Sequence, residues 1–199
     1  METGPIIIMN RTDQLKSKVE TLYKSKNPNR ADWADWLFEN HIFVVAEYAR
    51  QLASRFGGSS DLAEAASLLH DIADAIMARE NPLHEEQSKL IAREYLRESH
   101  FSADEIQIIV DDAIQFHGCK DGKAPKTLDG KIMATADALA HLKSNFYDYA
   151  LEVLKKTDTL DEIRNWALPK IERDYRNKIF FDEVRLEAKL DYERVKGLF

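Results

Sequence analysis

Cysteine, glycine and proline are all scarce in this chain of 199 residues. The single cysteine, Cys119, excludes an intramolecular disulfide and suits a reducing compartment. The 7 glycines and 5 prolines fall between periodic segments, as expected of long helices with short connections. Strand-like alternation of β-branched residues is missing, apart from a short run at 6–8. The sequence therefore predicts an all-α fold.

The chain also lacks long hydrophobic runs and an excess of positive charge. No apolar stretch approaches the roughly 20 residues that span a bilayer. The run 6–9 is too short for a signal-peptide core and has no basic lead-in. A net charge of −7, from 28 basic and 35 acidic residues, argues against generic nucleic-acid or anionic-membrane binding. We expect a cytoplasmic protein, in which a local basic pocket could still hold a small anion.

Apolar residues make up 44% of the chain, enough for a core, and they recur at three-to-four spacing. Ser60 is the expected N-cap of one helix, and Ser102 with Glu105 forms a capping box for another. Because no strict heptad persists, we predict a helix bundle rather than a coiled coil. Helices are expected at about 12–23, 31–39, 41–56, 60–73, 84–98, from 102, from 129, and, with Pro169 bending the first, at 160–177 and 182–198.

Histidine and aspartate recur where the helical pattern turns inward. His70 and Asp71 adjoin in SLLHDIAD, at the expected inner end of a helix. Asp137 lies among apolar helix neighbours in KIMATADALAHL, where a carboxylate costs several kcal/mol (roughly 2–7) unless it is paired or ligated. His117 ends one apolar face, and His41 begins another helix. Polar ligand types that converge from four helices indicate a metal site.

The donor types narrow the choice of metal. Imidazole and carboxylate together suit Mn, Fe, Zn or Co, whereas Mg prefers oxygen ligands alone. A single buried histidine is more often a hydrogen-bonded core residue, and Asp137 alone could cap a helix or pair with a lysine. It is the occurrence of these histidines and aspartates together, on several helices, that favours a metal site.

The order H…HD…D resembles the HD superfamily of metal-dependent phosphohydrolases. The matching strings are LLHDIAD and ATADALAHL, within roughly residues 30–145. The resemblance implies an HD-domain helical bundle with additional C-terminal helices. It also implies a divalent metal (Mn, Fe, Ni, Co or Zn) bound by His41, His70, Asp71 and Asp137.

Some members of that superfamily add two histidines and hold two ions. His84, in PLHEEQ, and His117, in AIQFHG, occupy matching positions in this chain. With two ions, Asp71 would bridge them; with one, the two histidines could contact a substrate phosphate instead. The sequence leaves one or two ions open.

Three kinds of residue near this pattern are candidates for other roles. The resemblance implies that Asp74, three residues after Asp71, acts with it in catalysis as a general acid or base. Lys120 and Lys123 follow His117, and Arg79 follows the HD pair, so we expect them to bind a substrate phosphate. A solvated helix face or loop is the alternative for each of them.

We expect three parts of the chain, of which the resemblance covers only the second. These are an N-terminal extension and helix at 1–30, an HD core at 31–145, and C-terminal helices at 146–199 that pack on the core or form a homodimer contact. The expected activity is hydrolysis of a small phosphoester, such as a nucleotide, by metal-activated water, as a phosphomonoesterase or phosphodiesterase. A di-iron oxygenase of the same fold and a non-catalytic helical binding module remain alternatives.

Overall fold

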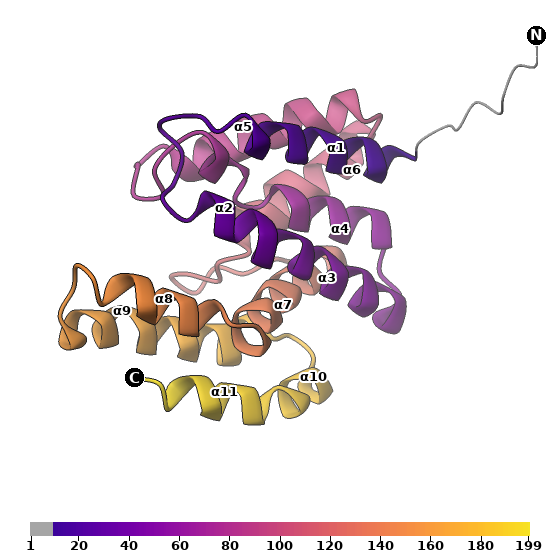
Figure 1. Cartoon of the computed structure of the whole chain (residues 1–199). Helices are drawn as coiled ribbons and strands as arrows, with labels where there is room; N and C mark the ends of the chain where they lie inside the picture. Colours follow the sequence, from indigo (N-terminus) through magenta and orange to yellow (C-terminus); the bar gives the residue numbers. More distant parts are fainter. Residues whose placement is uncertain (1–9) are drawn as a thin grey trace, which may run out of the picture.

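The computed structural model describes residues 10–199, and within this range every regular element is helical (Figure 1). The expectations for 1–9 lie outside the described residues. Short 3₁₀ or π segments are marked η. The elements in chain order are α1 (Arg11–Lys24), α2 (Ala34–Leu37), η1 (Phe38–Ile42), α3 (Phe43–Phe56), α4 (Ser60–Leu69), η2 (Ile72–Ala75), α5 (His84–Glu98), α6 (Ala103–Ile106), η3 (Gln107–Ile114), α7 (Leu128–Lys143), α8 (Phe146–Leu154), α9 (Leu160–Arg173), η4 (Asp174–Lys178), α10 (Asp182–Glu187) and α11 (Lys189–Lys196).

Local sequence sets several helix ends. The capping box predicted at Ser102 and Glu105 is present at the start of α6, and α5 has the predicted bounds. The N-cap predicted for α4 is wrong by one residue. Ser59, whose backbone is extended, accepts a hydrogen bond from the backbone N–H of Leu62, so it caps the helix in place of Ser60.

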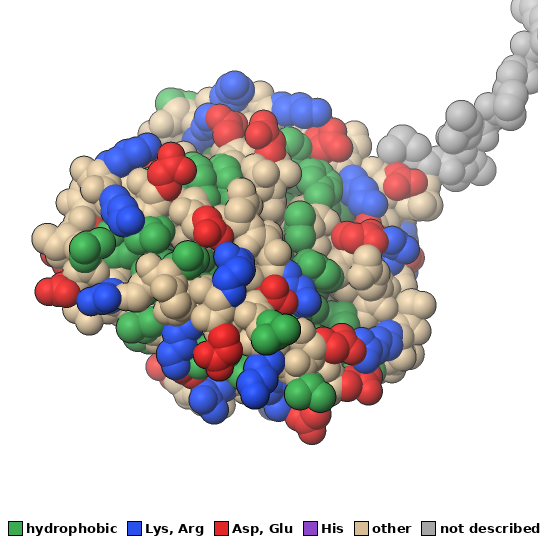
Figure 2. Space-filling view, turned by 60° about the horizontal axis from the view of Figure 1, so that its bottom comes forward, with side chains coloured by type: hydrophobic (Ala, Val, Ile, Leu, Met, Phe, Trp, Pro, Cys, Tyr) green, Lys and Arg blue, Asp and Glu red, His purple; other side chains and the backbone are tan. Residues whose placement is uncertain are grey.

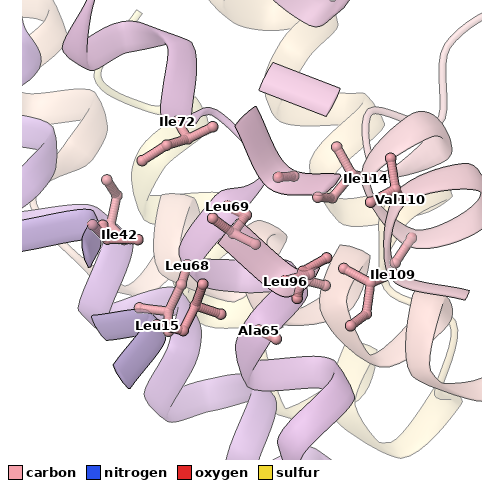
Figure 3. Close-up of a cluster of buried hydrophobic side chains, with 14 of the residues drawn as sticks. Leu15, Ile42, Ala65, Leu68, Leu69, Ile72, Leu96, Ile109, Val110 and Ile114 are labelled. Atoms are coloured by element: carbon pink, nitrogen blue, oxygen red, sulfur yellow. The ribbon is translucent and has the colours of Figure 1, made fainter. Parts of the chain in front are cut away.

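One hydrophobic cluster joins α1, α4, α5 and η3. Figure 3 shows side chains of these helices meeting between the ribbons, with Leu68 and Leu69 near the centre. Leu15, Leu69 and Ile109 are completely buried. Removing apolar surface of this kind from water is the main favourable term in folding.

A second cluster attaches the C-terminal helices to the same bundle. It joins α3, α7 and α8 to α9, α10 and α11, which lie on the opposite side of α7 from α1 and α5 in Figure 1. Helix α7 is shared by the two clusters, because Met133 belongs to the first while Ile132 and Ala136 belong to the second. Asp137 follows on this central helix, between the two cores.

The chain leaves helical geometry at the HD pair. A single helix was expected to run to Ala73, but α4 ends at Leu69 and His70 is its C-cap. Asp71 has a φ of −124°, outside the helical range, and the short 3₁₀ segment η2 follows. Because the helix ends before Asp71, the direction of the Asp71 side chain is not set by the helical register of α4.

The segment after α7 departs further from expectation. Helix α8 was not predicted as a separate element, and the helix expected at 182–198 is broken into α10 and α11 at Ala188. Trp36 stacks on Tyr149 of α8 with ring centroids 4.3 Å apart, which ties α2 to α8. None of the helices in residues 10–199 is long and apolar enough to cross a membrane.

Candidate metal centre

Four sequence-predicted side chains meet where η1, the C-terminal end of α4 and α7 approach one another. His41 Nε2 lies 3.2 Å from Asp137 Oδ1, and His70 Nε2 lies 3.8 Å from the same oxygen. Asp71 Oδ2 lies 3.5 Å from His70 Nε2. Two atoms that each sit about 2.1 Å from one ion are separated by roughly 3–4 Å, so these spacings suit a shared metal.

Backbone carbonyls orient two of the histidines. Nδ1 of His70 lies 2.7 Å from the carbonyl oxygen of Ser67, and Nδ1 of His117 lies 2.7 Å from that of Ile114. Because a carbonyl only accepts, Nδ1 carries the proton in each ring, which leaves the Nε2 lone pair free in the neutral form. Metal-ligating histidines are held in this way, with the second nitrogen donating to a carbonyl.

The cluster contains buried polar atoms that the protein itself does not satisfy. Nε2 of His70, Nδ1 of His41 and Oδ1 of Asp137 are all buried without a hydrogen-bond partner. Such atoms cost about 1–3 kcal/mol each when they remain unsatisfied. The unsatisfied Nε2 of His70 and Oδ1 of Asp137, with Nε2 of His41 3.2 Å from that oxygen, are donors that a first-row divalent ion accepts, so the residues present fit a metal.

Burial keeps these imidazoles neutral, as metal ligation requires. It lowers the pKa of His117 to about 4 and that of His141 to about 3. The pKa of His41 is lowered for the same reason, against the opposing effect of Asp137. At neutral pH, all three rings therefore offer a lone pair.

Cations hold the two carboxylates ionised. Burial alone would raise the pKa of Asp137, but the Lys178 ammonium and the hydrogen bond from His41 outweigh it and hold that pKa well below its ordinary value. Burial likewise opposes ionisation of Asp71, and Arg79, 2.7 Å away, overcomes it, so the pKa of Asp71 is also well below the usual range. Both groups are therefore ready to ligate a cation.

The structure brings His117 to the cluster, but not His84. His117 forms a group with His70 and Asp137 whose ligand atoms lie within 4.8 Å of one another. His84 Nε2 instead lies 2.8 Å from Asp74 Oδ1. The ring of His84 is thus paired with Asp74 in this structure, and its role as a ligand of a second ion stays a prediction.

Asp74 is buried, with one oxygen bonded to His84 and the other to Arg79, which also contacts Asp71. Arg79 therefore links the HD pair to the following 3₁₀ turn, in addition to lining the cavity described below. The catalytic role of Asp74 stays a prediction.

Sequence reasoning missed a second layer that lies behind Asp137. His141, one turn later on α7, has Nε2 3.5 Å from Asp137 Oδ1, and its Nδ1 lies 3.1 Å from Asp174 Oδ2. His41, Asp137 and His141 form a further group able to hold an ion. The signal was available in the sequence, because His141 is four residues after Asp137 and shares its helix face.

The other missed residues come from η4. Lys178, 3% exposed, is ion-paired to Asp137 Oδ2 and lies 3.5 Å from Asp174 Oδ1. Tyr147 donates a hydrogen bond to Asp174 at 2.7 Å. Burial opposes its charge, yet Asp137 and Asp174 raise the pKa of Lys178 above its ordinary value. No local pattern in the sequence points from position 178 to position 137.

A cavity of about 720 Å³ opens onto the cluster. Its walls include the cluster residues, and Lys120 and Lys123 line it as well. Lys120 is ion-paired to Glu85 at 3.1 Å, with 60% of its side chain exposed. Figure 2 shows one face of the molecule, on which basic and acidic side chains are interspersed.

A family model described as the HD domain matches residues 38–142, which include the four predicted ligands and His141. This span covers more than half of the chain, and the chain therefore belongs to the HD domain family. No curated protein and no solved structure matches it significantly. Members of this family are typically metal-dependent phosphohydrolases, and the buried histidine–aspartate groups agree with a divalent metal site of that type.

Proposed function

We propose that this protein is a metal-dependent hydrolase of small phosphate esters. The observation that carries the proposal is the pair of unsatisfied ligand atoms on His70 and Asp137, beside His41, at a cavity whose mixed basic and acidic lining includes several lysines and arginines. Neutral imidazoles beside ionised carboxylates suit a divalent ion, and lysines and arginines suit an anionic substrate.

His41, His70, Asp71 and Asp137 would hold the ion. When bound, a divalent ion lowers the pKa of water and polarises phosphoryl oxygens. The chain itself supplies orientation: carbonyls fix the rings of His70 and His117, and Lys178 holds Asp137 from behind. Arg79, between Asp71 and the cavity, is placed to stabilise charge on a phosphoryl group.

The geometry supports this function better than the oxygenase alternative. A two-iron site of the expected kind needs both His84 and His117, and His84 is engaged with Asp74. A binding module without catalysis would have no need for several buried, unsatisfied ligand atoms, which are costly to keep.

The test is hydrolysis of a panel of phosphomonoesters and phosphodiesters by protein reconstituted with Mn, Co, Ni, Zn or Fe. We expect at least one ester to be hydrolysed, and Asp71→Ala to lower kcat/KM by at least about 100-fold. Asp111→Ala is a matched control, because Asp111 is exposed and pairs with Arg93 instead. Equal activity of wild type and Asp71→Ala would refute the proposal.

A further inference from the structure

Helix α9 turns one face toward the cavity. Trp166, Lys170 and Arg173 all line it, at positions i, i+4 and i+7. Residues at this spacing share a face of an α-helix, so the arrangement is a property of the helix rather than of three separate loops. The whole of α9 lies beyond residues 38–142, the span matched by the HD domain.

Arg173 differs from most other cations of the cavity in having no anionic partner among residues 10–199. Arg79 pairs with two aspartates, Lys120 with Glu85 and Lys178 with Asp137. Arg173 makes no ion pair in the described part of the chain, and its Nε is buried without a hydrogen-bond partner. A half-buried guanidinium that lines the cavity and has no anionic partner can donate hydrogen bonds to an anion that enters the cavity.

Lys170 adds to the positive charge beside Arg173. Its ammonium lies 3.3 Å from Asp174 Oδ2 and 5.2 Å from the centre of the Phe146 ring. Burial lowers the pKa of Lys170, and the nearby positive charges act in the same direction. An incoming phosphate would relieve this crowding of cations, because it brings negative charge to them.

The other end of the same face is aromatic. Trp166 is 38% exposed, and its ring lies 6.3 Å from that of Tyr147. Leu154 and Phe146 also line this part of the cavity. An indole left half open beside apolar side chains offers a flat surface on which a planar group can stack.

Resting on the proposed function, we propose that this face of α9 binds the substrate and defines its class. Arg173 binds the phosphate, and Trp166 contacts a planar aromatic group of the same ester. The two residues are separated by about 10 Å along the helix axis, at about 1.5 Å per residue. A nucleoside monophosphate has this bipolar chemistry, with an anion at one end and a planar ring at the other.

The experiment measures binding, so that it does not depend on turnover. Calorimetry on full-length, metal-loaded protein gives the Kd of inorganic phosphate for wild type, Arg173→Met, Arg173→Lys and Arg176→Ala. We expect Arg173→Met to weaken binding on the order of 10- to 100-fold, and Arg173→Lys to restore part of it. Arg176→Ala, a matched control on η4 whose guanidinium pairs with Glu172, should bind as wild type does. Metal content should be equal in all four proteins.

Trp166→Ala tests the second half of the inference. It should weaken binding of a nucleoside monophosphate by about 5- to 10-fold while leaving the Kd of inorganic phosphate unchanged. Equal weakening of both ligands, or of neither, would show that Trp166 does not contact a planar group.

The outcomes separate this inference from the proposed function. If Arg173→Met binds phosphate as tightly as wild type, or if wild type binds none, the inference is overturned. If phosphate binds through Arg173 but no ester is hydrolysed, the inference stands and the proposed function fails. If wild type and Arg173→Met hydrolyse esters equally, the proposed function stands and the inference about Arg173 fails.

Discussion

Lys178 shows how a single residue outside the family motif shapes the metal centre. Its ammonium and the Asp137 carboxylate are both almost fully buried, and each satisfies the other. Removing one member of a buried ion pair leaves an uncompensated charge, which is far more costly than loss of an exposed pair.

We therefore expect Lys178→Met to lower the free energy of unfolding by about 3–5 kcal/mol in the presence of a chelator. Urea denaturation followed by circular dichroism measures this. Lys189→Met, at an exposed position on α11, should change stability by less than about 0.5 kcal/mol. A loss at Lys178 as small as that at Lys189 would mean that Asp137 does not need its partner.

The sequence predicted part of this centre at the level of residues. His41, His70, Asp71 and Asp137 could be singled out because polar groups on apolar helix faces need a partner. Lys178 and Asp174 could not, because their contacts with α7 depend on how distant helices dock. His84 followed the expected order along the chain, yet a single aspartate, Asp74, determines where its ring points.

At the scale of elements, the C-terminal helices are joined by a polar contact as well as by their core. Glu172 of α9 accepts hydrogen bonds from Tyr192 and Lys196 of α11, at 2.6 and 2.8 Å. Hydrogen bonds from Lys196, Tyr192 and Arg176 lower the pKa of Glu172 from its ordinary 4.5 to about 2. A carboxyl group whose pKa is lower in the folded than in the unfolded protein stabilises the fold at pH values above its unfolded pKa. This stabilisation is lost as the pH falls toward the folded pKa.

Glu172→Gln should accordingly destabilise the protein by up to about 1 kcal/mol at pH 7, a value kept small because the side chain is about one-third exposed. The difference from wild type should shrink as pH falls from about 4.5 toward 2. Denaturant unfolding at a series of pH values tests this, with Glu193→Gln, which is exposed, as the control. A difference that stays constant with pH would contradict the assignment.

Helix ends were predictable where side chains cap the backbone, as at Ser102 and Glu105. The end of α4 was not, because the chain leaves the helix at His70 for reasons of tertiary contact. There Tyr23 of α1 donates a hydrogen bond to the Asp71 carbonyl at 3.4 Å, a contact between segments far apart in the chain.

For the whole molecule, the all-helical class followed from periodicity and from the scarcity of glycine and proline. The placement of α8 to α11 did not, because amphipathic helices can pack in many ways and only the shared wall of α7 selects one. The candidate metal centre lies at this junction of two hydrophobic clusters, so binding of an ion there should be coupled to the stability of the entire fold.

Metal removal should therefore lower the melting temperature. An ion present at 100 times its Kd stabilises the folded state by about 2.7 kcal/mol. For a chain of this size, that corresponds to a shift of roughly 5–10 °C. Calorimetry before and after chelation measures it, and readdition of the ion should restore the original value. Identical melting of the two forms would argue that no ion binds the folded state.

We infer that the cluster around Asp137 binds a divalent metal. Elemental analysis of protein purified without a metal-binding tag measures this binding directly. We predict about one equivalent of Mn, Fe, Co, Ni or Zn in the wild type, and below about one-tenth of that in Asp137→Ala. A wild-type protein that holds no metal even after reconstitution, or an Asp137→Ala variant that keeps a full equivalent, would contradict the account.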